Sequence, residues 1–315
     1  MSSIVRVVVT GGTGFIGRAV VHALMARGDE AVVLTRGKAR AASHACQECG
    51  LGSKLELAHW TPEEAGSWQN VVDGADAVVH LAGASIGDGR WTPERMASIR
   101  ESRVRSTALL AEAMAEAKRK PRVFVSGSAT GYYGTKTGDR VVEEDAPAGD
   151  DFLARVCRDW EAAARPASEA GVRVVHPRMG IVLGRGGGVL GRMVPLFRAF
   201  VGGPIGDGTQ YVPWVHIRDV ARALEAMLTR EDLSGAYNTT APEPVTMNAF
   251  AEAIGAALQR PAAVRVPPFA VKMALGEDAA GVLLSGQRAT PRRLVDAGFA
   301  FVFPDLESAL ADLLS

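Results

Sequence analysis

Val5-Arg6-Val7-Val8-Val9-Thr10-Gly11-Gly12-Thr13-Gly14-Phe15-Ile16-Gly17 is the stretch that decides the fold of this chain of 315 residues. Its run of β-branched residues predicts a buried parallel strand, and the glycines that follow turn the chain directly into a helix. Their spacing fits G-x-x-G-x-x-G and the more general G-x-G-x-x-G, in which a helix N-terminus offers free N–H groups to a pyrophosphate. The stretch therefore predicts a dinucleotide site.

The residues of this turn have separate tasks. Gly11 allows the tight turn, Gly14 lets the backbone approach a pyrophosphate, and Gly17 lets the helix pack closely on the strand. A glycine-rich turn without a ligand is the alternative, but the amphipathic stretch 15–27 supplies the helix that the dinucleotide pattern requires. We expect the other residues of the turn to contact the dinucleotide too: Thr13, Phe15 and Ile16.

The residues that follow the second predicted strand, residues 31–34, indicate which dinucleotide binds. They are Thr35 and Arg36. An acidic side chain there would hold the ribose 2′-hydroxyl of NAD, whereas an arginine accommodates the 2′-phosphate of NADP. The acidic residues at 29–30 lie at the opposite end of the strand. Further positive charge follows at Lys38 and Arg40. We therefore predict NADP(H), with stacking of Arg36 on adenine, or capping of a loop, as the alternative.

Bulk properties exclude several classes of partner. The formal net charge is zero, and no long basic block invites nucleic acid or an anionic membrane. No apolar stretch approaches the roughly 20 residues that span a bilayer. Because the N-terminus runs directly into the first strand, we expect no removable signal and a cytoplasmic protein.

The three cysteines argue against a disulfide framework. Cys46 and Cys49, with His44 before them and His59 after them, look like part of a zinc or redox site. The second half of a zinc site is missing, and His59 falls in the next predicted strand. We therefore expect no metal and interpret these thiols as incidental.

Strand and helix patterns alternate through the first half of the chain. Thr92 and Pro93 supply an N-cap and a first-turn proline for a long helix that runs to about residue 118. Six such units with crossover helices predict a doubly wound parallel α/β sheet, the Rossmann arrangement. The other expected strands cover 54–59, 75–81, 121–126 and 172–176, and a further helix covers 150–170.

The rhythm changes beyond residue 177, where glycine and proline cluster at 184–188 and 202–208. One more strand and helix follow at 214–217 and 218–229, the helix capped by Asp219 or a neighbour. We predict a dinucleotide-binding domain of residues 1–180 and 214–238, and a smaller interleaved C-terminal substrate domain of residues 181–213 and 239–315. Its expected elements are helices at 246–259, 268–275, 291–297 and 306–314, and the apolar segment 299–303.

Several motifs carry a family resemblance. The chain resembles the extended short-chain dehydrogenase/reductases, which include sugar-nucleotide epimerases and dehydratases. The stretches that carry this resemblance are residues 10–17, 80–83, 126–134 and 214–220. More narrowly, the chain resembles an atypical branch, the epimerase family proteins of uncertain function, with a C-terminal domain of unknown function. The stretches that carry this likeness are 89–92, 151–163, 182–188, 202–206, 275–277 and 284–287.

The resemblance implies a catalytic Tyr-x-x-x-Lys pair on the helix after the fifth strand, with a glutamate four residues after the lysine. Glu161 fits that glutamate, which puts Cys157 in the lysine place and Leu153 in the tyrosine place. The tyrosine would be the general acid/base, and the lysine would lower its pKa and hold the nicotinamide ribose. Leucine can do neither, and cysteine supplies no fixed positive charge.

A literal Tyr-x-x-x-Lys occurs at 132–136, but its bracketing glycines predict a loop, so we interpret it as a coincidence. It follows Ser128, which resembles the active-site serine of the family and could hydrogen-bond a substrate oxygen. Tyr132 or Tyr133 could reach the nicotinamide and act as a substitute acid. The predicted catalytic residues are therefore Ser128, Tyr132 and Tyr133.

Other positions match the family more closely. The backbone of Leu81, Ala82 and Gly83 would pass along the ribose and phosphates of the cofactor. Arg103 takes the place of an asparagine and could reach the cofactor, although a solvated helix face explains it equally well. We also expect contacts from Arg178 and Val182 with the cofactor, and from Arg90 and Trp91 with the substrate; core packing of Trp91 is the alternative.

Two functions remain open from the sequence. The first is an NADP(H)-dependent oxidoreductase or epimerase-like enzyme that acts on a carbinol or ketone. Arginines suit a phosphorylated or nucleotide-linked substrate; the candidates are Arg90, Arg178 and Arg185. The second is a non-catalytic NADPH-binding regulator or scaffold, favoured by the missing Tyr-Lys pair. A homodimer is left open as well.

Overall fold

The computed structural model describes residues 5–37 and 55–315 and has a parallel sheet at its centre. The strands lie in the order β12-β8-β5-β4-β1-β2-β3, and a short β6 pairs with β8 beyond β5. Every pairing in this sheet is parallel, so the doubly wound α/β fold is confirmed. Its strands are β1 (Arg6–Thr10), β2 (Glu30–Thr35), β3 (Leu55–His59), β4 (Ala77–His80), β5 (Val123–Ser126), β6 (Ser128–Ala129), β8 (Arg173–Met179) and β12 (Gly235–Thr239).

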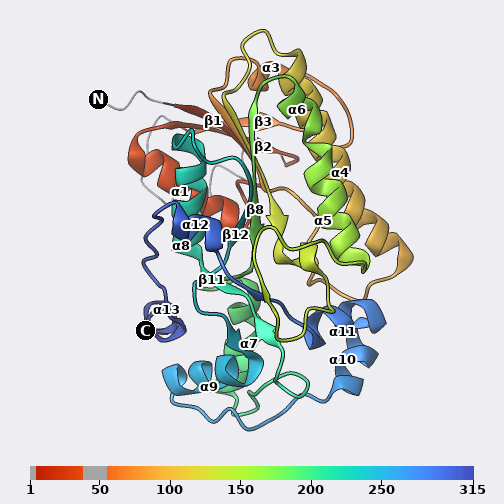
Figure 1. Cartoon of the computed structure of the whole chain (residues 1–315), viewed down its shortest axis with the longest axis vertical. Coiled ribbons are helices and arrows are strands. Elements are labelled where there is room, and N and C mark those ends of the chain that lie inside the picture. The colour runs from red at the N-terminus through yellow and green to blue at the C-terminus, as the bar shows by residue number, and fades with distance from the viewer. Residues whose placement is uncertain (1–4, 38–54) are drawn as a thin grey trace.

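Helices cover both faces of the sheet (Figure 1). Because of this, β1 is buried on both sides: Val7 and Val9 face the cluster that includes α1 and α8, and Val8 faces the opposite cluster. The covering helices are α1 (Phe15–Arg27), α8 (Ile217–Thr229), α3 (Gln69–Val72), α4 (Pro93–Glu116), α5 (Phe152–Ala163) and α6 (Arg165–Glu169).

The turn between β1 and α1 forms because only glycine fits it. Gly11 has a φ of +69°, in the left-handed region, and its carbonyl accepts a hydrogen bond from the Gly14 amide at 2.9 Å. A Cβ on Gly17 would lie 2.0 Å from the Gly11 carbonyl oxygen. The absence of that Cβ lets the first turn of α1 rest directly on the end of β1.

A second part of the molecule gathers below the sheet, as Figure 1 shows for α7, α9, α10 and α11. Its own apolar cluster joins α7, α9 and α13 around buried Trp214, Phe197 and Phe250. The division into two domains at the expected residues stays a prediction. The elements of this part are α7 (Gly188–Arg198), α9 (Met247–Leu258), α10 (Pro268–Leu275), α11 (Glu277–Leu284) and α13 (Leu306–Leu314). By contrast, α12 (Arg292–Asp296) packs beside β12, with Leu294 in the core cluster of the sheet (Figure 1).

Short strand pairs connect the two parts. β9 (Ile181–Leu183) runs parallel to β11 (Trp214–His216), and β10 (Tyr211–Val212) is antiparallel to β13 (Val245–Thr246). A third pair joins segments far apart in the sequence, β7 (Val141–Val142) and β14 (Arg288–Ala289).

Several expected elements differ in detail. The helix expected over 150–170 is two helices that meet at Ala164, because a proline at 166 cannot continue the first of them. The apolar segment 299–303 has neither helix nor strand, and the backbone amides of Val302 and Phe303 donate to the carboxylate of Asp219. Asp219 is therefore not the cap of α8, a task that His216 performs by accepting from the Arg218 amide at 3.0 Å.

Three expectations concern membranes and metals. In the described part of the chain, no helix combines the length and the apolar character that a membrane crossing requires. Cys46, Cys49 and His44, like Lys38 and Arg40, lie outside the described residues. Within residues 5–37 and 55–315, no group of three or more His, Cys, Asp or Glu side chains is placed to hold a metal ion.

Gly17→Ala tests the close contact between α1 and β1. The added methyl group meets backbone rather than a flexible side chain, so we expect the free energy of unfolding to fall by about 3 kcal/mol. Gly281→Ala is the matched control: a Cβ there meets nothing within 4 Å, so the change should be neutral or stabilising by up to about 1 kcal/mol. Urea denaturation of both variants measures the difference, and equal midpoints would contradict this account of the turn.

Candidate functional site

The expected site residues meet at one edge of the sheet. Parallel strands all end at the same edge, and the ends of β1, β4, β5 and β8 bring the glycine turn, residues 81–83, Ser128 and Arg178 there. A Cβ on Gly11 would lie 2.8 Å from the backbone of both Leu81 and Ala82. The first glycine turn and the segment after β4 therefore touch.

The N-terminus of α1 is open. Its N-cap residue, Gly14, has an extended backbone and no side chain that caps the helix, and no acidic residue lies in the first turn. No side chain therefore neutralises the positive end of the helix dipole, where the first amides point out of the helix. This end favours the binding of an anion. Thr13 is exposed beside this terminus, and Phe15 and Ile16 begin the helix.

Arg36 is exposed immediately after β2, where the sequence placed it. The preceding Thr35 fixes the exit of the chain: its carbonyl accepts from the Trp60 amide at 3.0 Å, and its hydroxyl accepts from the Gly37 amide at 3.3 Å. β2 is the next strand to β1, so the guanidinium and the open helix terminus share one edge of the sheet.

His80 holds the end of β4 in place. Its ring bonds to the Thr10 hydroxyl at 2.5 Å and to the Ser106 hydroxyl at 3.0 Å, which ties β4 to β1 and to α4. Burial, and the nearby Arg103 guanidinium, lower the pKa of His80 to about 3. His80 is therefore a neutral linker that positions residues 81–83.

Arg103 lies against that segment rather than in solvent. A Cβ on Gly83 would be 3.0 Å from the Arg103 Cζ, and the guanidinium stands over the Trp160 ring at 5.3 Å. Its Nη1 donates to the Ile99 carbonyl at 3.0 Å, and no carboxylate among the described residues forms an ion pair with it. Burial lowers the pKa of Arg103, so this cation has lost water without gaining a counter-charge.

Leu153 and Cys157 occupy the places that the family resemblance assigns to tyrosine and lysine. Both are buried on α5 below the 3-10 helix η1 (Thr130–Tyr133), and a Cβ on Gly131 would meet Leu153 at 3.4 Å and the Cys157 Sγ at 3.8 Å. Burial, with the Glu161 carboxylate nearby, raises the pKa of the Cys157 thiol to about 12. The thiol is neutral and supplies no charge.

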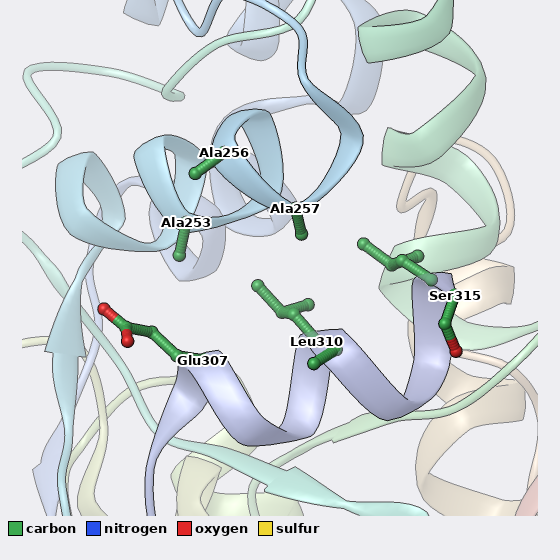
Figure 2. Close-up of a pocket in the computed structure, with 8 residues that line it drawn as sticks. Ala253, Ala256, Ala257, Glu307, Leu310 and Ser315 are labelled. Carbon is green, nitrogen blue, oxygen red and sulfur yellow. The ribbon is translucent and has the colours of Figure 1, made fainter.

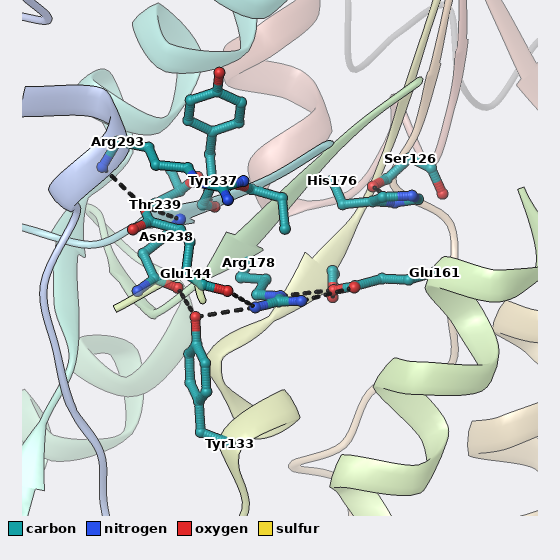
Figure 3. A network of polar contacts seen from close by, with 12 residues as sticks. Ser126, Tyr133, Glu144, Glu161, His176, Arg178, Tyr237, Asn238, Thr239 and Arg293 are labelled. Carbon is teal, nitrogen blue, oxygen red and sulfur yellow. Dashed lines mark hydrogen bonds and ion pairs between the residues drawn. The ribbon is translucent and has the colours of Figure 1, made fainter. Parts of the chain in front are cut away.

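A buried polar network lies between α5 and β8 (Figure 3). The Arg178 guanidinium, whose residue is 4% exposed, donates to both carboxylate oxygens of Glu161 at 2.8 and 2.9 Å. The Ser128 hydroxyl donates to the same carboxylate at 2.6 Å. Although burial alone would lower the pKa of Arg178, the Glu161 carboxylate raises it above its ordinary value.

Tyr133 belongs to the same network. Its hydroxyl donates to the Asn238 Oδ1 at 2.6 Å and accepts from the Arg178 Nη1 at 3.1 Å. Burial raises the pKa of Tyr133 to about 12. This hydroxyl has both of its bonds inside the protein, and the expected role of Tyr133 as a proton donor stays a prediction. Ser128 is 1% exposed and its hydroxyl is bonded to Glu161, and its expected catalytic role stays a prediction.

Tyr132 differs from its neighbour. Its ring is half-buried and lies 3.5 Å from the Arg178 Cζ, measured to the ring centroid. The rings of Tyr132 and Tyr133 meet edge to face, with centroids 5.5 Å apart. No described residue forms a hydrogen bond with the Tyr132 hydroxyl. Of the three expected catalytic residues, Tyr132 alone keeps its hydroxyl free within the described structure.

The arginines expected at a substrate phosphate are already occupied, apart from Arg90. Arg178 forms an ion pair with Glu161, and its expected contact with cofactor or substrate stays a prediction. The Arg185 guanidinium donates to the carbonyls of Asp312 and Ser315 at the end of α13. Arg90 is exposed, with one bond of 3.4 Å to the Met273 carbonyl.

Trp91 and Val182 are placed at the boundary between the two parts. The Trp91 amide donates to the Leu275 carbonyl at 3.3 Å, and its ring packs edge to face on Phe152 at 5.6 Å. Val182 lies in β9, pairs with Val215 and is buried in the same cluster as Val7 and Val9. Trp91 thus combines the packing role with a position between α5 and α10.

Glu144 and Asn238 are the network residues that the sequence analysis did not single out. The Asn238 amide donates to the Glu144 Oε1 at 3.0 Å, and the Asn238 side chain donates to the carbonyls of Val142 and Thr290. Burial raises the pKa of Glu144. The available signal was a polar run, Asn238 to Thr240, inside an otherwise apolar strand pattern.

A separate hollow of about 540 Å³ lies between α9 and α13 (Figure 2). Alanine and leucine side chains line most of it, with Glu307 and Ser315 as its polar members. None of the expected site residues lines it. This hollow is therefore not the site that the sheet edge forms.

Comparison with known proteins identifies the family. The NAD dependent epimerase/dehydratase family model matches residues 7–239, and a domain of unknown function, DUF1731, matches residues 266–313. The chain belongs to the NAD dependent epimerase/dehydratase family. This membership confirms the resemblance that the glycine turn and the later motifs carried.

Individual relatives agree over nearly the whole length. The chain is 41% identical to epimerase family protein ML0860 of Mycobacterium leprae, covering 97% of this chain and 94% of the relative. It is 40% identical to the chloroplastic SDR39U1 homolog of Arabidopsis thaliana, covering 97% and 86%. The crystal structure of human SDR39U1 with NADPH superposes with a TM-score of 0.85 at 36% identity, covering 98% and 99% of the two chains.

The acid stability of the fold should depend on His80. Unfolded His80 binds a proton below about pH 6.5, whereas the folded residue stays neutral down to about pH 3. The unfolded state therefore binds more protons between these values, and the free energy of unfolding should fall by about 1–2 kcal/mol between pH 6.5 and pH 5. His80→Asn should remove this part of the loss in urea denaturation at the two pH values.

His22→Asn, at an exposed position of α1, is the control and should keep the full dependence of the parent protein. His176 and His216, whose pKa values burial also lowers, leave a residual slope in every variant. A His80→Asn variant as sensitive to acid as the parent would contradict the linker role.

Proposed function

We propose that the protein binds NADP(H) and exchanges a hydride between its nicotinamide and a carbinol or ketone, as an oxidoreductase or epimerase-like enzyme. The observation that carries this proposal is the uncapped N-terminus of α1, bounded by glycines and in contact with residues 81–83. A dinucleotide pyrophosphate matches this terminus in charge and in its need for close backbone approach.

The residues present fit the cofactor. At Gly11 and Gly17 a Cβ would collide with neighbouring backbone, so these glycines allow the strand, the turn and the helix to come close together, and the positive end of α1 has no anion of its own. Arg36 supplies the charge that a 2′-phosphate requires, and a relative of 36% identity was crystallised with NADPH. The residues that would hold the cofactor are Gly11, Thr13, Gly14, Phe15, Ile16, Gly17, Thr35, Arg36, Leu81, Ala82, Gly83, Arg103 and Val182.

Arg103 supports the proposal because no described carboxylate forms an ion pair with it. A half-buried guanidinium without a carboxylate is costly unless a ligand oxygen meets it. It stands beside Gly83 and near the neutral Cys157 thiol, whose pKa its charge lowers in opposition to burial, so it would supply positive charge where the family uses lysine. Arg103 would thus hold the nicotinamide half of the cofactor in place of that lysine.

The chemistry divides between the cofactor and the chain. The bound nicotinamide supplies or accepts the hydride, and the protein orients the substrate, excludes water and moves a proton. On the substrate side we retain Arg90 and Trp91, which lie between α5 and α10. Because Arg178 and Arg185 are bonded within the chain, recognition of a nucleotide-linked substrate would depend on Arg90 among the three arginines expected for that task.

A non-catalytic NADPH-binding regulator is the second candidate. Leu153 and Cys157 favour it, because neither side chain performs acid–base chemistry at these positions. The two candidates share the cofactor site and differ in turnover.

Arg36→Ala tests the choice of cofactor. Removing a charge-assisted hydrogen bond should weaken NADPH binding about 10- to 100-fold, while NADH binding, which lacks the 2′-phosphate, stays unchanged. Titration of NADPH fluorescence gives both dissociation constants. Arg105→Ala, an exposed arginine of α4, is the control and should bind NADPH like the parent. Equal loss for NADH and NADPH in the Arg36 variant would contradict the assignment.

Turnover separates the two candidate functions. We expect the protein loaded with NADPH to reduce at least one member of a panel of ketones and 4-keto sugar nucleotides, measured as the loss of NADPH absorbance. Arg103→Ala should lower both NADPH affinity and the rate, whereas Arg105→Ala should change neither. Tight NADPH binding with no oxidation across the panel would favour the regulator instead.

A further inference from the structure

We propose that Tyr132 gives and takes the proton of this reaction, and that the buried Arg178–Glu161 pair positions its ring. This inference rests on the proposed function. It names the general acid of the reaction, because Leu153 stands where the family carries its catalytic tyrosine. The geometry that points to it is the free hydroxyl of Tyr132 above an immobilised guanidinium.

Tyr132 is in the right place to replace the missing acid. Its helix η1 follows β6 at the edge of the sheet where the open terminus of α1 also lies. Gly131, the residue before Tyr132, rests directly on Leu153 and Cys157. The phenol therefore comes from the segment that covers the positions where the family carries its tyrosine and lysine.

The two adjacent tyrosines have opposite roles. The Tyr133 hydroxyl is buried between Asn238 and Arg178, and its side chain fastens η1 to the core. The Tyr132 ring is half-buried, while its hydroxyl has no partner among the described residues. A general acid needs a hydroxyl that can meet a substrate oxygen, and Tyr132 meets this requirement.

Arg178 provides a rigid surface for the Tyr132 ring. Its guanidinium is held in its own plane by two bonds to Glu161, one to Tyr133 and one to the Glu144 carbonyl at 3.0 Å. These bonds leave the face of the guanidinium free, and the Tyr132 ring lies 3.5 Å from it. A planar, delocalised cation is suited to such stacking, whereas the compact ammonium of lysine is not.

The proposed reaction needs one hydride, from the nicotinamide, and one proton, from Tyr132. In the reductive direction the dihydronicotinamide gives a hydride to the carbonyl carbon, the C–O π bond opens, and Tyr132 gives its hydroxyl proton to the oxygen. The carbonyl is reduced to an alcohol while the nicotinamide is oxidised, and the tyrosinate regains a proton from solvent. Arg178 and Glu161 touch neither reacting atom, so they are positioning residues.

Tyrosine-selective NMR tests the placement without any turnover. The chain has four tyrosines, at 132, 133, 211 and 237, so ring-labelled protein gives few signals, each assigned by a Tyr→Phe variant. Saturating NADP⁺ should shift the Tyr132 signal most, with little change at Tyr211. Nucleotide binding that leaves the Tyr132 signal unmoved would overturn the proposal. Absence of nucleotide binding would overturn the proposed function, and this proposal with it.

Kinetics test the proton transfer itself. Tyr132→Phe should lower kcat about 10²- to 10⁴-fold with an unchanged dissociation constant for NADPH. Tyr211→Phe is the matched control, since this ring also lies over an arginine, Arg288 at 5.1 Å, and should keep the parent kcat. An unaltered kcat in Tyr132→Phe overturns the proposal.

Two conservative variants test the positioning pair. Arg178→Lys keeps the charge but loses the planar surface, and Glu161→Gln keeps the shape but loosens the guanidinium. Both should lower kcat at least tenfold with little change in KM, and both should weaken the shift of the Tyr132 signal on adding NADP⁺. A purely structural pair would alter the urea midpoint alone, and that result would overturn the positioning role.

Discussion

The contact between Gly17 and the carbonyl of Gly11 is the constraint on which the rest of the structure depends. It allows α1 to begin directly at the end of β1, with no side chain between helix and strand. The N-cap residue of this helix, Gly14, has no side chain that could cap it. The first amides of α1 are therefore left for an acceptor from outside the chain. The same glycine turn touches Leu81 and Ala82, so one local packing requirement shapes both sides of the proposed phosphate site.

A second constraint organises the other half of the site. Arg178 is buried, and burying a charge is tolerable only when it is paired and hydrogen-bonded throughout. Glu161, Tyr133 and the Glu144 carbonyl satisfy it, which draws α5, η1 and the loop before α5 onto β8. Arg103 shows the contrasting case: its guanidinium is also withdrawn from water but lacks a carboxylate among the described residues. The satisfied arginine builds the site, and the unsatisfied one is available to a ligand.

Local patterns explain what the sequence could predict. The strand, glycine turn and first helix are encoded within residues 5–27, and Thr92 caps α4 as its spacing with Pro93 indicated. Contacts across long stretches of sequence were not accessible in this way. The sequence predicted Ser128 and Tyr133 as catalytic residues, but it could not show their hydrogen-bond partners, Glu161 and Asn238, which lie 33 and 105 residues away. α7 escaped prediction because it begins in a glycine cluster and contains Pro195, both unfavourable signals for a helix.

The most direct test of the central claim is a crystal structure of the protein grown with NADP⁺. We expect the pyrophosphate to lie on the first amides of α1, beside Gly14, and the 2′-phosphate to lie at the Arg36 guanidinium. A nucleotide bound elsewhere on the molecule, or a 2′-phosphate directed away from Arg36, would contradict the central claim.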